Sequence, residues 1–264
     1  MYHLFHRSLG MDESLFVRLS RVTPSASVTL KLQYRMCGPV NVLANKLTYG
    51  GELECGSQEI EQATLQLPSL TSIQEKYADR PWLLSVIKPG LLHAVVFLDT
   101  SLLGAIKATR SGNENDESNK SPVNHLEADI AMLIVQALHG SGLSYDQVGI
   151  IAPYQSQVQH LKKMAVEMPE LEINTVDQYQ GRDKEAIVYS CTKSEPDTDS
   201  MNKEGAQTIM HDIRRLTVAV TRAKHKLIVI GDSETLQRYP PFAKLLSSLE
   251  SSQRYQLCAG KDKL

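Results

Sequence analysis

Short apolar runs rich in β-branched residues alternate with longer segments of helical periodicity, and this alternation constrains the fold more than any other feature of the chain. Strands are predicted at residues 28–32, 94–98, 148–152, 172–176, 186–190 and 227–230. Helices are predicted at residues 39–47, 125–139, 154–168 and 209–223. Strands that alternate with helices at this spacing indicate an α/β fold, a parallel sheet with helices on both faces.

Residue types at the predicted helix ends agree with this assignment. Asn124 is suited to cap the helix that follows it, with Glu127 three residues on, and Gly140 follows the helix. Pro39 suits a first helical turn, and Asp232 is a second candidate N-cap.

Two polar stretches, residues 111–121 and 193–207, interrupt the pattern and are predicted to be loops. The 264 residues suit one large domain with appendages. The four cysteines have neither zinc nor redox spacing, which favours ordinary reduced thiols, and we predict no metal site. No apolar run approaches the ~20 residues of a membrane span, and the first residues lack a signal-peptide pattern.

Ligands of parallel α/β sheets bind at the carboxyl ends of the strands, so the chemistry is expected just after predicted strands. Residues 33–36, 153–155 and 175–183 have this position. The net charge of −2 does not mark a nucleic-acid binder, but residues 214–226 contain a local cluster of basic side chains. The alternative is that these basic side chains form an ordinary solvent-exposed face of the domain.

Three segments, LQYRM (32–36), NTVDQYQGRDKE (174–185) and RRLTVAVTRAKHK (214–226), resemble motifs IV, V and VI of superfamily 1 helicases. The stretch NKLTYGGELECGS (45–57) resembles the eukaryotic replication helicase/nuclease family rather than the RNA-decay branch. The resemblance implies a second RecA-like (P-loop NTPase-type) domain over residues 8–246. Residues 1–7 would be an extension and residues 247–264 a tail.

By this resemblance, Arg35 and Arg222 are the catalytic arginines that face the γ-phosphate of ATP. A guanidinium presents a planar fork to phosphate oxygens, which suits it to that task. Either arginine alone would be read as a surface ion pair.

The resemblance also implies nucleotide contacts. Tyr34 would stack on the adenine, or else pack at the end of a strand, with Gln33 beside it. Gly181 permits close approach of a ligand to the backbone. Asp183 corresponds to an acidic residue that reaches the ribose, although some relatives carry the longer Glu.

The nucleic-acid contacts implied by the resemblance are Thr175, Tyr154, Gln157 and Arg182. Thr175 would bind a backbone phosphate or, equally, end a strand. Tyr154 would lie on the nucleic-acid path or pack at a helix start. In relatives, the segment that contains Gln180 and Arg182 couples the ATP cleft to the nucleic-acid path.

The phosphate-cradling loop GxxxxGK(S/T) is absent from the sequence. Asp99 ends an apolar run, but Thr100 follows where a metal-binding motif needs an acid, so Asp99 is predicted to be an ordinary strand end. ATP and Mg²⁺ would therefore be shared with an upstream Walker-bearing RecA-like domain, in cis or in trans. The family's nuclease part and iron–sulfur cysteines would also lie upstream, which makes the chain look like a fragment.

The resemblance therefore predicts the C-terminal motor half of a 5′–3′ DNA helicase of replication and repair. It would bind single-stranded DNA in the nucleus, with mitochondria as a second location, and would be inactive alone. Two alternatives are a non-catalytic module that binds single-stranded nucleic acid or protein, and an RNA helicase of the decay branch.

Overall fold

A computed structural model describes residues 14–103, 109–111, 121–194, 209–259 and 262–263. The chain divides into two compact units, residues 1–32 and 33–264, and each is described by itself. Most of the two polar stretches, residues 112–120 and 195–207, lies outside the described residues.

In the first unit, α2 (Leu15–Val22) is capped by the side chain of Ser14, which accepts a hydrogen bond from Val17 N. The predicted strand at 28–32 is wrong for its first four residues. These residues are in no strand, and Val28 and Leu30 are 86% and 84% exposed. A β-branched sequence favours a strand only where a partner strand and a buried face are available.

The second unit is built around a parallel sheet of six strands, in the order β10-β3-β9-β8-β6-β7. The strands are β3 (Val95–Asp99), β6 (Val148–Ala152), β7 (Glu172–Thr175), β8 (Lys184–Ser190), β9 (Ala223–Gly231) and β10 (Arg254–Gln256). Every pairing within this sheet is parallel. The predicted α/β class and five predicted strands are therefore confirmed.

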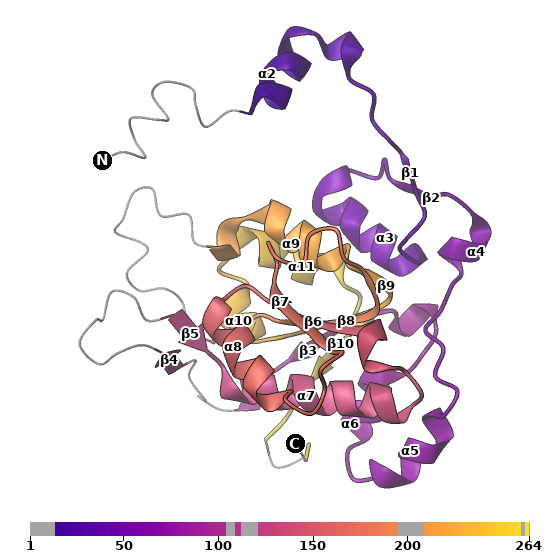
Figure 1. Cartoon of the computed structure of the whole chain (residues 1–264), viewed down its shortest axis with the longest axis vertical. Helices are drawn as coiled ribbons and strands as arrows, with labels where there is room; N and C mark the ends of the chain where they lie inside the picture. Colours follow the sequence, from indigo (N-terminus) through magenta and orange to yellow (C-terminus); the bar gives the residue numbers. More distant parts are fainter. Residues whose placement is uncertain (1–13, 104–108, 112–120, 195–208, 260–261, 264) are drawn as a thin grey trace. The chain divides into compact units, whose positions relative to one another are not determined.

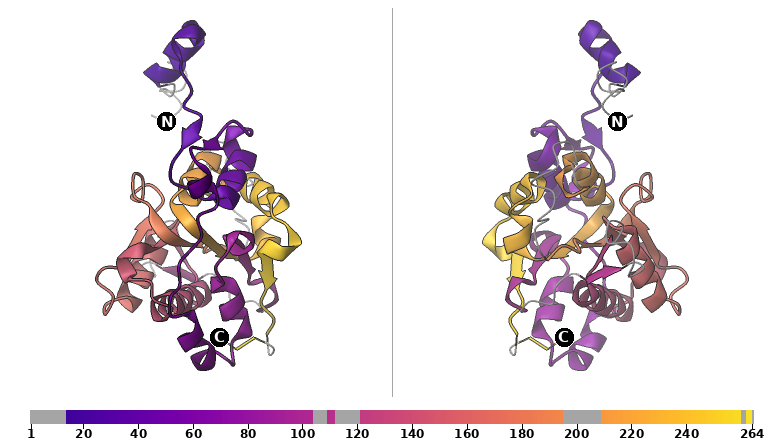
Figure 2. Two further views of the ribbon diagram at one scale, coloured as in Figure 1. Left: turned by 90° about the vertical axis from the view of Figure 1, so that its right-hand side faces the viewer. Right: turned by 90° about the vertical axis from the view of Figure 1, so that its left-hand side faces the viewer.

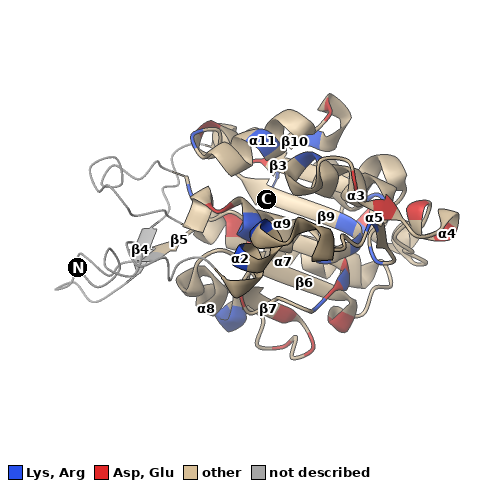
Figure 3. Ribbon diagram, turned by 90° about the horizontal axis from the view of Figure 1, so that it is seen from above, with Lys and Arg blue, Asp and Glu red and all other residues tan. Residues whose placement is uncertain are grey.

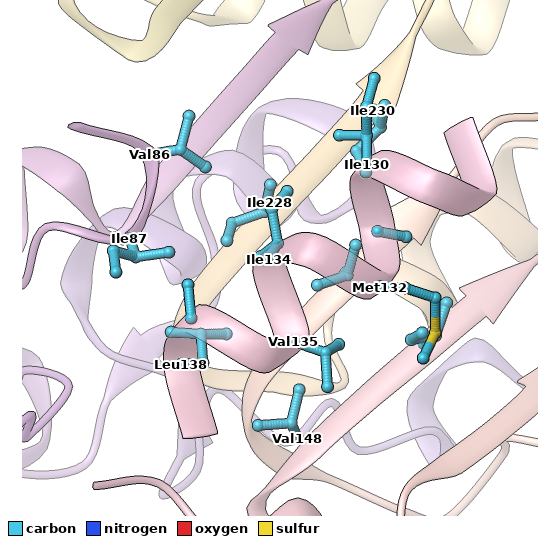
Figure 4. Close-up of a cluster of buried hydrophobic side chains, with 14 of the residues drawn as sticks. Val86, Ile87, Ile130, Met132, Ile134, Val135, Leu138, Val148, Ile228 and Ile230 are labelled. Atoms are coloured by element: carbon cyan, nitrogen blue, oxygen red, sulfur yellow. The ribbon is translucent and has the colours of Figure 1, made fainter. Parts of the chain in front are cut away.

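Helices cover both faces of the sheet (Figures 1 and 2). The helices of this unit are α3 (Gly38–Ala44), α4 (Gln58–Glu61), α5 (Leu70–Lys76), α6 (Pro81–Ile87), α7 (His125–Gly140), α8 (Gln155–Met164), α9 (Ile213–Val220), α10 (Ser233–Leu236) and α11 (Pro240–Ser248). One buried core joins α5, α6, α7 and α8 to the sheet, and a second joins α3, α9 and α11 to it. Figure 4 shows the first core, where Ile134 and Val135 of α7 lie beside Ile228 and Val148 of the sheet. Strands buried on both faces account for the continuous apolar runs in the sequence.

Two small two-stranded sheets lie outside the main one. β1 (Leu32–Gln33) neighbours β2 (Glu54–Cys55), and β4 (Thr109–Ser111) pairs antiparallel with β5 (Ser121–Val123). A five-residue π-helix, η2 (Asn45–Tyr49), continues directly from α3.

The predicted helix caps are confirmed. The Asn124 side chain accepts a hydrogen bond from Glu127 N at 3.0 Å, and the Asp232 carboxylate accepts from Glu234 N at 2.9 Å. Asp99 is the predicted strand end. Its carboxylate accepts hydrogen bonds from Ser101 N, Ser233 N and the Ser233 hydroxyl, at 3.0, 3.1 and 2.6 Å.

The sheet extends past the predicted domain end at residue 246. β10 pairs with β3 at one edge, and the indole N–H of Trp82 donates to Lys263 O at 2.9 Å, so residues 254–256 and Lys263 of the predicted tail contact the domain. A three-residue strand of sequence RYQ carries too little apolar pattern to be predicted. The predicted helix at 209–223 is also shorter than expected, because α9 ends at Val220 and Arg222 follows it.

Lys226 of β9 is a buried lysine without a carboxylate partner among the described residues. Its ammonium donates to the carbonyl oxygens of Lys88, at 3.0 Å, and of His93. Burial lowers the pKa of Lys226 to about 7. The unfolded chain, where the pKa is about 10.4, binds this proton more tightly than the folded chain does.

A folded-state pKa below the unfolded value makes this group's stability contribution depend on pH. The cost of burying the charged ammonium applies in full below pH 7 and disappears above about pH 10.4. The free energy of unfolding should therefore rise with pH between these two values, by up to about 1.4 kcal/mol per pH unit. We expect Lys226→Met to flatten that slope in chemical denaturation, whereas Lys163→Met, on the exposed side of α8, should not. An unchanged slope in Lys226→Met would contradict this prediction.

Candidate functional site

The predicted site residues lie at two opposite edges of the sheet, not at the carboxyl edge alone. Asp183 and Arg222 immediately precede β8 and β9, so they lie at the amino ends of these strands. Tyr154 and Thr175 lie at the carboxyl ends of β6 and β7. The prediction placed residues 175–183 at the carboxyl edge because they follow the strand β7. The segment instead crosses to the amino edge, where Asp183 immediately precedes β8.

Arg35 and Arg222 meet at the amino edge. The Arg35 guanidinium donates to Thr221 O at 3.3 Å, one residue before Arg222. Cys37 N donates to Lys224 O at 2.8 Å, which fixes the segment that carries Arg35 against the start of β9. Two arginines separated widely in the sequence therefore share one rim of the domain.

Neither arginine is buried against an internal carboxylate. Arg222 is 8% exposed, and its guanidinium donates to Val218 O, Arg182 O and Thr221 Oγ1 at 3.0, 3.5 and 3.1 Å. A guanidinium has five N–H donors, so these three bonds leave two for a ligand. Burial first, and then the charge of Arg35, lowers the pKa of Arg222, so a bound anion would relieve the repulsion between the two cations.

The rim carries more positive than negative charge. Asp183 bridges Arg35 at 3.9 Å and Lys224 at 3.4 Å, and Lys224 also pairs with Glu185 at 3.1 Å. The hydrogen bond from His225, followed by Lys224, lowers the pKa of Glu185 to about 2. Arg35, Arg222 and Lys224 thus face two carboxylates. Figure 3 shows how positive and negative residues are distributed along the ribbon.

Asp183 has a different local role from the predicted ribose contact in this structure. Both of its carboxylate oxygens take part in ion pairs, one with each basic neighbour. Asp183 therefore holds Arg35 and Lys224 together, and a ribose would have to share its oxygens.

Gln33 organises the backbone around Arg35. Its amide oxygen accepts from Arg35 N at 2.8 Å and Met36 N at 2.7 Å, and its amide nitrogen donates to Met36 O at 2.8 Å and Cys55 Sγ at 3.1 Å. These bonds occupy the side chain that was predicted to touch the nucleotide. Gln33 is thus placed to orient Arg35.

Tyr34 is 67% exposed, and its ring lies against Gly56. A Cβ at Gly56 would come within 2.2 Å of that ring, so a glycine is needed beneath it. Tyr34 directly follows β1, so its contact with Gly56 also fits the alternative of a tyrosine packed at the end of a strand, and stacking on the adenine stays a prediction. Gly181 has φ of +83° with open space around it, which favours glycine and leaves its backbone accessible.

Most of the basic cluster at 214–226 is paired within the domain. Arg215 forms a two-pronged ion pair with Asp177, with both N–O distances 3.0 Å, and Lys226 is buried as described above. Arg182, whose side chain is 58% exposed, pairs with Glu172 at the amino edge. Arg182 therefore lies near the arginine rim, away from Tyr154 and Thr175.

At the carboxyl edge, Tyr154 and Thr175 are half-buried. The ammonium of Lys193 lies 5.8 Å from the centre of the Tyr154 ring. The sequence prediction did not single out Lys193, because it begins a polar stretch with no strand or helix signal.

Gln157 lies inside the domain instead of on a nucleic-acid path. It is fully buried, its amide donates to Asn124 O and Ser190 Oγ at 3.0 and 3.2 Å, and it accepts from Asn124 N at 2.8 Å. Gln157 therefore ties α8 to β8 and to the start of α7. No signal in the sequence distinguishes this buried amide from an exposed one.

Within the described part of the chain, no three His, Cys, Asp or Glu side chains gather in a way that could hold a metal ion. No helix among the described residues is long and apolar enough to span a membrane.

Comparison with known proteins gives consistent matches. A family model described as an AAA domain matches residues 11–234. The DNA replication ATP-dependent helicase/nuclease DNA2 of Bos taurus is 38% identical over 256 residues, which covers 94% of this chain and 22% of that protein. The Homo sapiens protein of the same name is also 38% identical, over 94% of this chain and 22% of its own length. The Arabidopsis thaliana helicase/nuclease JHS1 is 39% identical over 92% of this chain and 17% of its own length. The chain thus spans about a fifth of these relatives.

Proposed function

Because the chain belongs to the AAA domain family, we propose that it is the second motor half of an ATP-dependent DNA helicase. The observation that carries this proposal is the meeting of Arg35 and Arg222 at one rim, where Arg222 keeps two N–H donors for a ligand. The names of its relatives support DNA replication as the setting, and with it the nucleus. Translocation from 5′ to 3′ and a role in repair belong to the same proposal.

Different rim residues contact different parts of the nucleotide. Arg35 and Arg222 bind the γ-phosphate and stabilise the charge that develops there as phosphate transfer proceeds. Tyr34 offers its exposed ring to the adenine, and Gly181 lets a nucleotide approach the backbone. Mg²⁺ neutralises phosphate charge when bound, and its ligands belong to a Walker-bearing domain that faces this rim.

The carboxyl edge is the proposed contact for single-stranded DNA. Tyr154 offers part of an aromatic face for a base, and Lys193 adds a positive charge beside that ring. Thr175 provides a hydroxyl for a phosphate at the end of the neighbouring strand β7. Arg182, at the other edge, is assigned to the nucleotide side.

The division of the ATP site predicts the behaviour of the chain on its own. We expect the purified chain to show no Mg²⁺-dependent ATP hydrolysis, because its sequence has no phosphate-cradling loop. Added to the Walker-bearing motor domain of a relative with single-stranded DNA, it should stimulate turnover.

The controls separate this proposal from a non-catalytic binding module. Arg35→Ala should remove the stimulation while leaving the far-ultraviolet circular dichroism unchanged. DNA binding without any stimulation, or with stimulation that Arg35→Ala leaves intact, would favour the binding module. Turnover by the chain alone that Arg222→Ala abolishes would contradict the division of the site.

A further inference from the structure

The chain makes a strained turn directly after β8. Thr192 has φ of +70°, and among the described residues no other residue except glycine has a positive φ. Lys193 N donates to Cys191 O at 2.8 Å, which closes a three-residue turn with Thr192 at its centre. A turn of this kind with positive φ is rare, and a β-branched residue fits its backbone poorly. Such strain persists where surrounding contacts impose it, often at functional sites.

A buried carboxyl group supplies the contact that holds this turn. Glu127, in the first turn of α7, is fully buried, and its Oε2 accepts from Thr192 N at 2.7 Å and from the Ser190 hydroxyl at 2.6 Å. Asn124, which caps the same helix, donates to the other Glu127 oxygen at 3.2 Å and to Thr192 O at 3.3 Å. The start of α7 therefore binds both the N–H and the C=O group of Thr192.

Other bonds of the same network join the surrounding elements. Gln157 of α8 donates to the same Ser190 hydroxyl at 3.2 Å, and Asn124 donates to the Ser194 hydroxyl at 2.8 Å. The bonds to Thr192 act beyond the end of β8, so they fix the direction in which the chain leaves the sheet. A strained residue that is held on both sides indicates that this direction matters.

The turn sets the position of the next side chain, that of Lys193. Its ammonium lies 5.8 Å from the centre of the Tyr154 ring, and the residue is 8% exposed, so packing confines the side chain. A change of φ at Thr192 from +70° to the usual negative values would rotate the chain beyond it. That rotation would move Lys193 away from the ring.

We propose that Glu127 is a positioning residue for the DNA contact. Its carboxyl group holds Thr192 in the left-handed conformation and thereby places Lys193 beside Tyr154. This inference rests on the proposed binding of single-stranded DNA at the carboxyl edge, where a positive charge beside an aromatic ring suits a phosphate next to a stacked base. Glu127 is fully buried, so it acts through the turn and does not touch DNA itself.

The test is binding of a fluorescein-labelled oligothymidylate to the whole chain, measured by fluorescence anisotropy at several salt concentrations. Lys193→Met should weaken binding about 2-fold to 10-fold. It should also reduce the slope of log Kd against log salt by about 0.7, the value for one phosphate contact on a single strand. Glu127→Met, which removes both oxygens, should give the same two changes. The Glu127→Met/Lys193→Met variant should bind no more weakly than Glu127→Met, because both changes act on one contact.

Three further variants separate the turn from general stability. Burial raises the pKa of Glu127 to about 8, against the hydrogen bonds from Ser190 and Thr192, which lower it. Glu127→Gln, the neutral counterpart, keeps an acceptor oxygen and should retain most of the binding. Glu250→Met, at an exposed carboxylate, is the matched control and should bind normally. Glycine adopts positive φ without steric cost, so Thr192→Gly should restore part of the affinity of Glu127→Met, and it relieves the strain if Glu127→Met alone does not fold.

The outcomes distinguish this inference from the proposed DNA contact. If Lys193→Met binds weakly and Glu127→Met binds as the unmodified chain does, the inference fails and the DNA contact stands. A lower Tm of Glu127→Met with an unchanged salt slope would assign Glu127 to stability alone and also overturn the inference. If Lys193→Met binds normally, or the unmodified chain does not bind the oligonucleotide, the proposed DNA contact fails and the inference fails with it.

Discussion

Arg222→Ala in the complete motor should lower ATP turnover by roughly 100-fold or more, because an arginine finger contributes about 10³–10⁵ to the rate. Arg222 is suited to this role because only part of its guanidinium is used within the domain. Arg35→Ala should have an effect of similar size, since the two side chains share one rim. Steady-state hydrolysis with saturating single-stranded DNA measures both.

The size of the loss should depend on the shape of the side chain as well as its charge. Arg222→Lys keeps the charge but not the planar fork, so it should recover only part of the turnover. Arg238→Ala, on the exposed turn after α10, is the matched control and should behave as the unmodified protein. Near-normal turnover in both Arg35→Ala and Arg222→Ala would show that the motif assignment is wrong.

Trp82→Ala should be the most destabilising simple truncation in the α6 region. Trp82 is fully buried in the first core, and its indole N–H holds Lys263 near the end of the chain. Truncation of a buried Trp costs about 3–5 kcal/mol. For a domain of this size, such a loss lowers Tm by roughly 6–20 °C, which far-ultraviolet circular dichroism would detect.

Two variants calibrate that result. Trp82→Phe keeps an aromatic ring and loses the N–H, so it should lower Tm by a smaller amount. Leu92→Ala, a truncation of a side chain that is 77% exposed, should leave Tm nearly unchanged. A Trp82→Ala protein with the Tm of the unmodified chain would mean that residues 262–263 and α6 do not pack as described.

The sequence was sufficient to predict five of the six strands of the main sheet. Strands such as 148–152 are apolar on both faces, and caps such as Asn124 act within a few residues, so their signals are local. The motif pattern also placed Arg35 and Arg222 at one site, and the structure brings them to one rim, while their role in ATP hydrolysis stays a prediction.

What the sequence could not provide depends on contacts between distant residues. Gln157 is a buried structural amide because Asn124 and Ser190 surround it, and neither contact is visible in the local pattern. Gln33 is likewise occupied by its own turn and by Cys55. The edge on which Asp183 lies follows from β8, the strand that comes after it, whereas the prediction placed residues 175–183 by the strand that comes before.

The segment between β7 and β8 has a consequence for how such a motor would transmit force. It leaves the sheet beside Thr175, is fixed midway by the fully buried Tyr179, and returns at Asp183 among the rim cations. One short peptide therefore joins the proposed DNA contact at Thr175 to Asp183, which pairs with Arg35 at the rim. If the buried Tyr179 keeps this peptide from changing shape, a movement at the DNA contact would shift Asp183, and DNA stepping and nucleotide release would be linked through one segment of chain.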